Sequence, residues 1–125
     1  MKPKFTEEII QDLDLGVDTI YISMNDPNTG RQIGQTESRW YGHWHLGDIW
    51  VDTNLRRQGL GTTLINETCS RLWARNLAPI TVDAVPQDQS ITQEELNIFY
   101  EMAGFASTNL QRRFRRTSSL IDLHI

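Results

Sequence analysis

The segment that decides the fold spans residues 46–85 and reads LGDIWVDTNLRRQGLGTTLINETCSRLWARNLAPITVDAV. Residues 46–52 contain the apolar run IWV, which is typical of a buried strand. After Gly59 the apolar residues recur at spacings of three and four, a period that predicts a helix ending near Asn76. Residues 79–85 read as a second strand. A strand, a helix and a strand in this order predict a right-handed crossover between two parallel strands.

Strand-like stretches precede this crossover. Residues 17–24 are β-branched and aromatic, and a turn-forming run follows them at residues 25–30. Residues 33–44 resume the strand pattern, with Gly42 as a turn or bulge, and such hairpin connections make the strands antiparallel. The pattern of residues 1–15 does not decide between a helix and a strand, because their apolar residues fit the period of each.

A helix and short strands are expected after the crossover. Thr92 followed by Glu95 is a capping-box pattern, and the helix that begins there would stop at Gly104. Strand-like stretches at residues 110–114 and 119–125 complete the sequence. We therefore expect an α/β (α+β) domain with a mixed, mostly antiparallel sheet, a central βαβ crossover and flanking helices.

Length and composition limit the classes to which the protein can belong. With 125 residues, 38% of them hydrophobic and 22% charged, the chain fits one globular domain, residues 1–125. The net charge of −4 argues against a nucleic-acid partner, because phosphate binding normally needs a basic surplus. A single cysteine, no leader-like start and no long apolar run lead us to expect a soluble, cytoplasmic protein without a membrane partner.

The turn between the first strand and the helix of the crossover is a candidate anion site, and it reads Arg56-Arg57-Gln58-Gly59-Leu60-Gly61-Thr62. Its glycines let the backbone N–H groups of a positive helix end approach a phosphate, and its arginines add charge. It lacks the Gly-Lys-Ser/Thr ending of a P-loop. Leu64 stands where the dinucleotide fingerprint needs a third glycine, although Asp83 lies at a suitable distance for a ribose contact. The alternative without a ligand is a glycine pair that only turns the chain.

Two signatures in this order resemble the GNAT family of N-acetyltransferases. Residues 56–61 match the pattern Arg/Gln-x-x-Gly-x-Gly/Ala, and residues 99–105 (FYEMAGF) resemble an aromatic pair followed by Gly-Phe. Upstream, residues 49–51 resemble the family's central strand, whose backbone pairs with the pantetheine arm of CoA. The resemblance covers residues 46–105 and implies the GNAT fold, with acetyl-CoA as the cosubstrate and no metal.

The resemblance implies a role for each matching residue. Val51 would donate its amide N–H to the thioester oxygen, and Tyr100 would be the acid for the departing thiolate. A tyrosine pKa of about 10 against a thiol pKa of about 8.5 suits that role; the alternative for Tyr100 is an ordinary core aromatic. The residues implied in binding acetyl-CoA are Ile49, Val51, Arg56, Arg57, Gln58, Gly59, Leu60, Gly61 and Thr62.

The base that takes a proton from the acceptor amine has three candidates. His45 is the first, because it lies where some family members carry a catalytic Glu or His, and histidine titrates in the useful pH range. Glu37 on the preceding strand is the second. Asp48 is the third, and its strand parity points to the face opposite His45. Each of them also suits an ordinary position on a strand.

Other reactive side chains have structural explanations. His43 and His45 lie two apart on one expected strand face, but no further ligand is near them in sequence, so we expect no metal site. Cys69 falls on the apolar face of the first helix, where an inert thiol is normal. The arginines of residues 112–116 would be split between two strand faces. Three aromatic residues fit either a core or an acceptor pocket: Trp40, Tyr41 and Trp44.

The chain departs from the family pattern in two places. Gln93 and Leu96 stand where many members have Asn and Ala, and the segment before Val17 is too short for two helices that wall the acceptor pocket. We therefore expect reduced N-terminal helices. Our hypothesis is an N-acetyltransferase that moves an acetyl group from acetyl-CoA to a primary amine by direct attack. The amine would belong to a small molecule or a protein, and a homodimer is allowed. The alternative is a CoA-binding regulatory or assembly module without catalysis.

Overall fold

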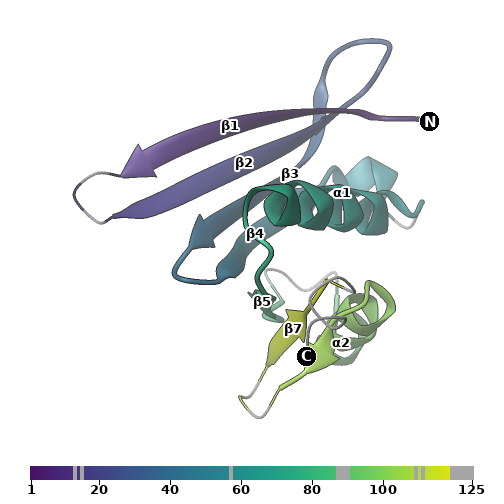
Figure 1. The fold of residues 1–125 in the computed structure, drawn as a ribbon. Coiled ribbons are helices and arrows are strands. Elements are labelled where there is room, and N and C mark those ends of the chain that lie inside the picture. The colour runs from purple at the N-terminus through teal and green to yellow at the C-terminus, as the bar shows by residue number, and fades with distance from the viewer. Residues whose placement is uncertain are drawn as a thin grey trace.

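The computed structural model describes residues 1–12, 14, 16–56, 58–86, 91–108, 110 and 112–118. Within them, one seven-stranded sheet has the order β1-β2-β3-β4-β5-β7-β6 (Figure 1). The elements are β1 (Lys4–Asp12), β2 (Val17–Asn25), β3 (Gln32–Trp40), β4 (Trp44–Val51), η1 (Thr53–Leu55), α1 (Leu60–Arg75), β5 (Ile80–Asp83), α2 (Gln93–Met102), β6 (Ala106–Ser107) and β7 (Arg113–Arg116). All described strand pairs are antiparallel except β4 with β5, which α1 connects. The predicted βαβ crossover and mostly antiparallel sheet are confirmed.

The N-terminal segment, whose structure the pattern left open, is the edge strand β1. Phe5 packs against the core, and Glu7 binds two arginines of α1, Arg71 at 2.8 Å and Arg75 at 2.7 Å. β1 ends at residue 12 and β2 begins at residue 17, and none of the described residues between them is helical. The expected reduction of the N-terminal helices is confirmed.

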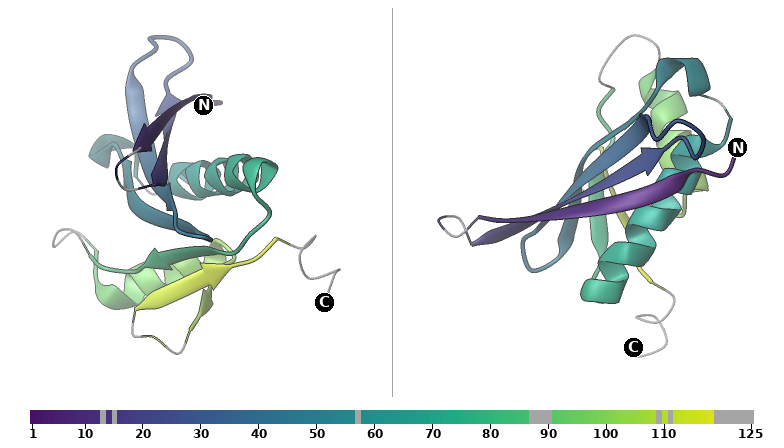
Figure 2. Two further views of the ribbon diagram at one scale, coloured as in Figure 1. Left: turned by 60° about the vertical axis from the view of Figure 1, so that its left-hand side comes forward. Right: turned by 90° about the horizontal axis from the view of Figure 1, so that it is seen from above.

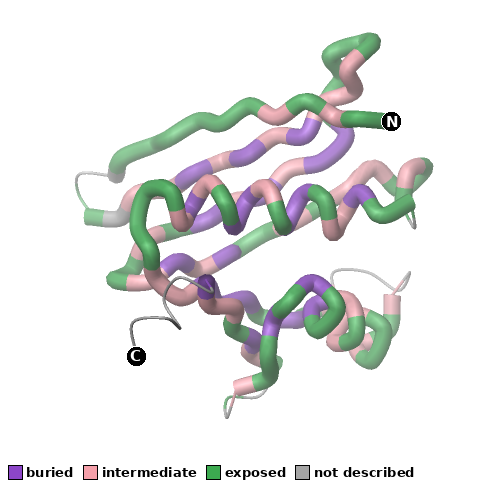
Figure 3. The backbone as a smooth tube through the Cα atoms, turned by 45° about the vertical axis from the view of Figure 1, so that its right-hand side comes forward, coloured by how far each residue is buried: buried purple, intermediate pink, exposed green. Residues whose placement is uncertain are grey.

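Both α-helices cover the same face of the sheet (Figure 2). On this face Thr36 of β3 shares a buried hydrogen bond of 2.8 Å with Thr68 of α1. Phe114 of β7 lies against Tyr100 of α2, with ring centroids 6.1 Å apart. The core lies between this face and the helices, and burial alternates along the central strands as a half-covered sheet requires (Figure 3).

The other face carries no helix in the described part of the chain, and we call it the helix-free face. Strand register and side-chain contacts place on it Tyr21, Glu37, Arg39, His45, Thr81, Asp83, Arg113 and Arg115.

The two α-helices begin and end as the sequence pattern predicts. α1 ends one residue before Asn76, and Thr92 and Glu95 form the expected capping box of α2. No helix among the described residues is both long and apolar enough to cross a membrane.

Two expectations about the strands need correction, and a third is not tested. His43 lies between β3 and β4, in a turn where Gly42 has φ 84°, so it does not share a strand face with His45. The strand expected at residues 110–114 begins later, at Arg113, because Arg112 adopts φ 61° in the preceding turn. This strand, β7, pairs with β6, whose two residues are too few to show the alternation of a strand in the sequence. The strand expected at residues 119–125 lies outside the described residues.

Candidate functional site

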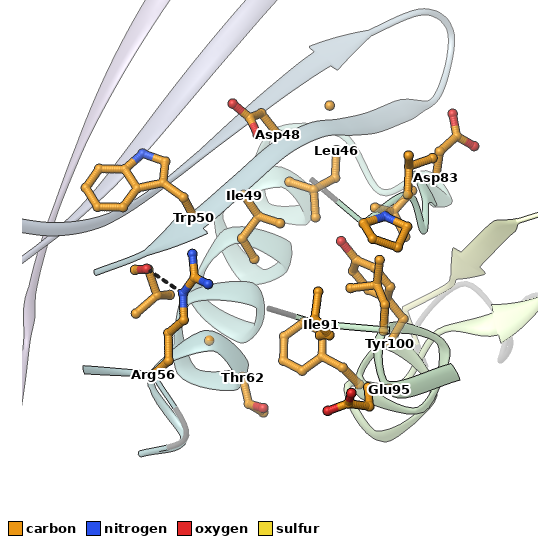
Figure 4. Close-up of a pocket in the computed structure, with 18 of the residues that line it drawn as sticks. Leu46, Asp48, Ile49, Trp50, Arg56, Thr62, Asp83, Ile91, Glu95 and Tyr100 are labelled. Carbon is orange, nitrogen blue, oxygen red and sulfur yellow. Dashed lines mark hydrogen bonds between the residues drawn. The ribbon is translucent and has the colours of Figure 1, made fainter. Parts of the chain in front are cut away.

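A cleft opens where β4 and β5 part. Their parallel register covers three residue pairs and ends at Leu46 and Val82, whereas β4 continues to Val51. The cleft has a volume of about 570 Å³, within the range of about 300–1,000 Å³ that is common for small-molecule sites. Its walls come from β4, the start of α1, the end of β5 and α2 (Figure 4).

A β-bulge in β4 decides which side chains reach the cleft. Glu37 of β3 pairs with Asp48, but the next residue, Ser38, pairs with Leu46, so Gly47 is an extra residue on β4. This residue shifts the alternation by one, and Asp48 therefore shares the helix-free face with His45. The predicted parity of Asp48 is wrong for this reason. Asp48 lines the cleft.

The cleft also exposes a backbone edge of β4. Asp52 donates its N–H toward β3, to the carbonyl of Ile33 at 2.8 Å. Successive residues of a strand direct their backbone groups to alternate edges, so the N–H and C=O of Val51 face the cleft. Arg56 confirms this direction, because its Nε donates to the Val51 carbonyl at 3.2 Å (Figure 4). An extended ligand can pair with such an edge as an added strand.

The start of α1 forms a second wall of the cleft. Gly59 is its N-cap residue with φ 78°, a left-handed conformation that favours glycine. A Cβ on Gly59 would meet no described atom within 4 Å, so an anion can approach the positive helix end here. Gly61 serves packing instead, because a Cβ there would lie 3.2 Å from the ring of Phe99 on α2.

Tyr100 of α2 closes the cleft on the helix-covered side. Its ring packs edge-on against Phe99 and Phe105, with centroids 5.3 and 5.7 Å away. Burial, and then the charge of Asp48, raises the pKa of the Tyr100 hydroxyl to about 12. The hydroxyl points into the cleft (Figure 4). It keeps its proton at neutral pH and can donate a hydrogen bond to a negative charge that develops there.

His45 lies next to the cleft, on the helix-free face. Its Nδ1 is 2.7 Å from Oγ1 of Thr81, and its Nε2 is 3.7 Å from Oδ2 of Asp83, a residue that lines the cleft. Arg113 donates to both carboxylate oxygens of Asp83, at 2.8 and 3.1 Å, and thereby lowers the pKa of Asp83. Burial lowers the pKa of His45 below its ordinary value, and the charge of Asp83 opposes that shift.

Most residues predicted to bind the cosubstrate meet in this cleft. Its lining includes Ile49, Val51, Arg56, Gly59, Gly61, Thr62 and Tyr100. Two other predicted residues are not part of the lining: Gln58 is exposed, and Leu60 is buried in the core. Arg57 lies outside the described residues.

The two leading base candidates also stand outside the lining of the cleft. His45 lies 3.7 Å from Asp83, which is part of the lining, and Glu37 forms an ion pair with Arg39 at 2.9 Å. No sequence pattern indicated Asp83 in this position, because its contacts with His45 and Arg113 join three strands that are far apart in the chain.

The remaining candidates have structural roles. Burial raises the pKa of the Cys69 thiol to about 11, which agrees with an inert thiol. Of the three aromatic residues left open, Trp44 is buried, Trp40 packs edge-on against it and Tyr41 is exposed, and none of them lines the cleft. Across the described residues, no group of three or more His, Cys, Asp or Glu side chains is arranged to hold a metal ion.

Several solved structures resemble the protein. The anti-CRISPR protein AcrVA5 is 28% identical, with a TM-score of 0.61 over 68% of this chain and 90% of its own. An aminoglycoside 6'-N-acetyltransferase complexed with coenzyme A is 18% identical, with a TM-score of 0.64 over 79% and 72%. AtaTR bound with AcCoA is 18% identical, with a TM-score of 0.61 over 96% and 97%. AtaT complexed with acetyl-methionyl-tRNAfMet is 16% identical, with a TM-score of 0.62 over 97% and 99%.

These likenesses bear on the fold and on one expectation about partners. At 16–18% identity, the aminoglycoside enzyme and AtaT show a shared fold. The net charge does not exclude a nucleic-acid partner as we expected, because a protein of this fold was solved with a tRNA. A search of curated protein sequences finds no match.

A sequence model of the acetyltransferase (GNAT) domain matches residues 17–107, which is more than half of the chain. The match includes β2 to β6, the cleft between β4 and β5, and the glycine-containing start of α1. The chain therefore belongs to the GNAT family of acetyltransferases.

Proposed function

We propose that the protein is an N-acetyltransferase that moves an acetyl group from acetyl-CoA to a primary amine by direct attack. The observation that carries this proposal is one cleft that joins an open β4 edge, a glycine-capped helix start and a protonated tyrosine. Acyl transfer from a thioester needs a polarised carbonyl, a stabilised leaving group and an uncharged amine. Membership of the family supports acyl transfer from acetyl-CoA, and the identity of the acceptor is part of the proposal.

The walls of the cleft fit successive parts of acetyl-CoA. Gly59 and Arg56 would hold the diphosphate, with the backbone of residues 58–62 at the positive end of α1 and Arg57 as a second positive charge. Val51 would pair with the pantetheine arm and donate its N–H to the thioester oxygen. Tyr100 lies where the thioester sulfur would then leave.

Proton transfers require two more roles. His45 takes the proton from the acceptor ammonium, because it is neutral at pH 7 and lies beside a carboxylate that lines the cleft. Glu37 is the second candidate, and its carboxylate is engaged in an ion pair with Arg39. Tyr100, with a pKa of about 12, stays protonated and stabilises the departing thiolate chiefly by a hydrogen bond.

The first test removes the Tyr100 hydroxyl. Tyr100→Phe should lower turnover by about 100-fold or more, the usual cost of one lost hydrogen-bond donor to a developing charge, and should leave the acetyl-CoA affinity unchanged. Calorimetry with acetyl-CoA measures binding, and an assay of CoA thiol release measures turnover. Tyr41→Phe is the matched control, because Tyr41 is exposed and outside the cleft.

An assay of CoA release with a panel of acceptor amines decides between an acetyltransferase and a CoA-binding module without catalysis. It should contain small amines, a lysine-bearing protein and an amine carried by an aminoacyl-tRNA. Full turnover by Tyr100→Phe would contradict the role of Tyr100. Tight acetyl-CoA binding without CoA release by any acceptor would favour the alternative, a CoA-binding module that regulates or assembles.

A further inference from the structure

We infer that His45 and Asp83 together bind the acceptor amine at the mouth of the cleft on the helix-free face, with Thr81 and Arg113 as positioning residues. We call these four residues the amine seat. The inference rests on the proposed function and adds where the acceptor binds, which atoms hold it and from which side it arrives.

Thr81 selects the tautomer of His45. The Thr81 hydroxyl donates to the backbone carbonyl of Trp44 at 3.4 Å, so its lone pairs are left to accept a hydrogen bond. The ring nitrogen Nδ1 of His45, 2.7 Å from this oxygen, is then the protonated one. In a neutral imidazole the other nitrogen, Nε2, carries the lone pair. His45 therefore presents a base toward Asp83.

The gap between His45 and Asp83 matches a nitrogen that donates two hydrogen bonds. Nε2 of His45 and Oδ2 of Asp83 are 3.7 Å apart, longer than the roughly 2.7–3.2 Å of a direct N–H···O bond. Both atoms are acceptors when the imidazole is neutral, so they do not satisfy each other. An ammonium placed between them can donate one N–H to each.

Arg113 keeps Asp83 ionised and oriented. The two-pronged contact with both oxygens fixes the plane of the carboxylate, and it leaves Oδ2 in reach of His45. The charged or titratable groups on the face of His45 come from four elements. They are Asp48 on β4, Glu37 and Arg39 on β3, Asp83 on β5, and Arg113 and Arg115 on β7, with His43 in the preceding turn. Among the carboxylates of this face, Asp83 is the one with an oxygen 3.7 Å from Nε2 of His45, and it attracts a cationic acceptor to this point.

The helix-free face gives the acceptor its approach. His45, Thr81, Asp83 and Arg113 all lie on this face, whereas Gly59 and Tyr100 belong to helices on the other face. The acceptor thus arrives from the side opposite the cosubstrate, through the parted strands. Figure 4 shows Asp83 on the far side of the cleft from Arg56 and Thr62.

The proton and bond changes at the seat balance. The ammonium gives one proton to Nε2 of His45, and Asp83 stabilises the resulting imidazolium. The amine lone pair attacks the thioester carbon, a C–N bond forms and the C–S bond breaks. The sulfur leaves as a thiolate hydrogen-bonded to Tyr100, and it takes up the proton that the new amide nitrogen loses. His45 returns its own proton to solvent.

Determining the tautomer of His45 by NMR tests the amine seat without any measurement of turnover. Long-range ¹H–¹⁵N spectra of the wild-type protein above the pKa of His45 should show the Nδ1–H form, and titration with n-butylammonium should shift the Nε2 resonance. The same titration of Asp83→Asn should produce no shift. An Nε2–H tautomer, or an unchanged resonance in the wild-type protein, would overturn the amine seat even if the enzyme acetylates some amine.

Kinetics supplies the second test. Asp83→Asn should raise the KM for the amine at least tenfold, and should move the acidic limb of the kcat/KM profile to lower pH, because the Asp83 charge holds the pKa of His45 up. Thr81→Val should lower kcat/KM about tenfold, and Thr81→Ser should restore it. All of these variants should bind acetyl-CoA normally.

The matched control is Glu8→Gln, which removes an exposed carboxylate from β1, away from the cleft. Its kinetics should equal those of the wild type. An Asp83→Asn protein with an unchanged KM and an unchanged pH profile would refute the seat. If the wild type releases no CoA with any amine but shows both predicted His45 signals, the proposed function fails while the amine seat stands.

Discussion

Among single residues, Gly59 combines a backbone requirement with the phosphate contact that we propose for it. Its φ of 78° turns the chain into α1, and the space where a Cβ would stand is open to an anion. Gly30, with φ 75° and equally open surroundings, turns the chain between β2 and β3 and is not part of the cleft lining. The same substitution at the two glycines therefore distinguishes the effect of backbone strain, which both share, from an effect on the proposed ligand contact, which only Gly59 makes.

Gly59→Glu should lower the acetyl-CoA affinity by at least 100-fold, because a carboxylate would occupy and repel the position of the diphosphate. Gly30→Glu should bind acetyl-CoA as the wild type does. Both variants should lose a similar amount of stability, about 1–2 kcal/mol, for a side chain in the left-handed region. Calorimetry and thermal unfolding measure the two effects, and equal affinities for both variants would contradict the proposed phosphate site.

At the scale of the element, α2 holds Tyr100 against the cleft and depends on its capping box. Thr92 accepts a hydrogen bond from the N–H of Glu95 at 3.1 Å, and Glu95 accepts one from the N–H of Thr92 at 3.3 Å. The helix has ten residues, too few to be stable alone. Its cap and the packing of Tyr100 and Phe99 are what keep it in place.

Thr92→Ala should lower the free energy of unfolding by about 1 kcal/mol, the typical value of an N-cap hydroxyl. Thr92→Ser keeps an oxygen at the same position and should lose much less. Denaturant unfolding of the three proteins measures the difference. Equal losses for Ala and Ser would mean that the hydroxyl does not cap α2.

At the scale of the whole molecule, Glu7 joins the first strand of the chain to α1. Its carboxylate binds Arg71 and Arg75, and hydrogen bonds from Arg75 and then Arg71 lower the pKa of Glu7 below 4.5. A lowered pKa in the folded state adds stability above the ordinary pKa, and this stability is lost as the pH falls through the lowered value. These contacts tie the edge strand β1 to α1, although the partners are more than sixty residues apart in the sequence.

Glu7→Gln should therefore be less stable than the wild type at pH 7, by up to about 1 kcal/mol for each partly exposed ion pair. The difference should shrink as the pH falls below 4.5, the ordinary value for glutamate. Urea unfolding at several pH values measures it, with Glu8→Gln as a control from the same strand. A difference that stays constant from pH 7 to pH 3 would show that Glu7 does not act through its charge.

Local patterns were enough to predict the helices, the crossover and several of the residues that line the cleft. α1 and α2 have strong periods and clear end signals, and the chain enters α1 at Gly59 as expected. Short or ambiguous strands were harder to predict. β6 has only two residues, and the apolar residues of β1 fit the period of a helix as well as that of a strand. For β1, the hydrogen bonds to β2 and the ion pairs to α1 select the strand.

By itself, then, the sequence determined the βαβ crossover, the helix start at Gly59 and membership of a family that uses acetyl-CoA, since each rests on residues close together in the chain. Only the tertiary structure shows which side chains lie beside His45, where we propose that the acceptor binds. The bulge at Gly47 turned Asp48 to the face of His45, and strand pairing brought Asp83 and Arg113 beside that histidine. The physical reason is that register and strand pairing are properties of neighbouring strands, and neither is recorded in the local sequence.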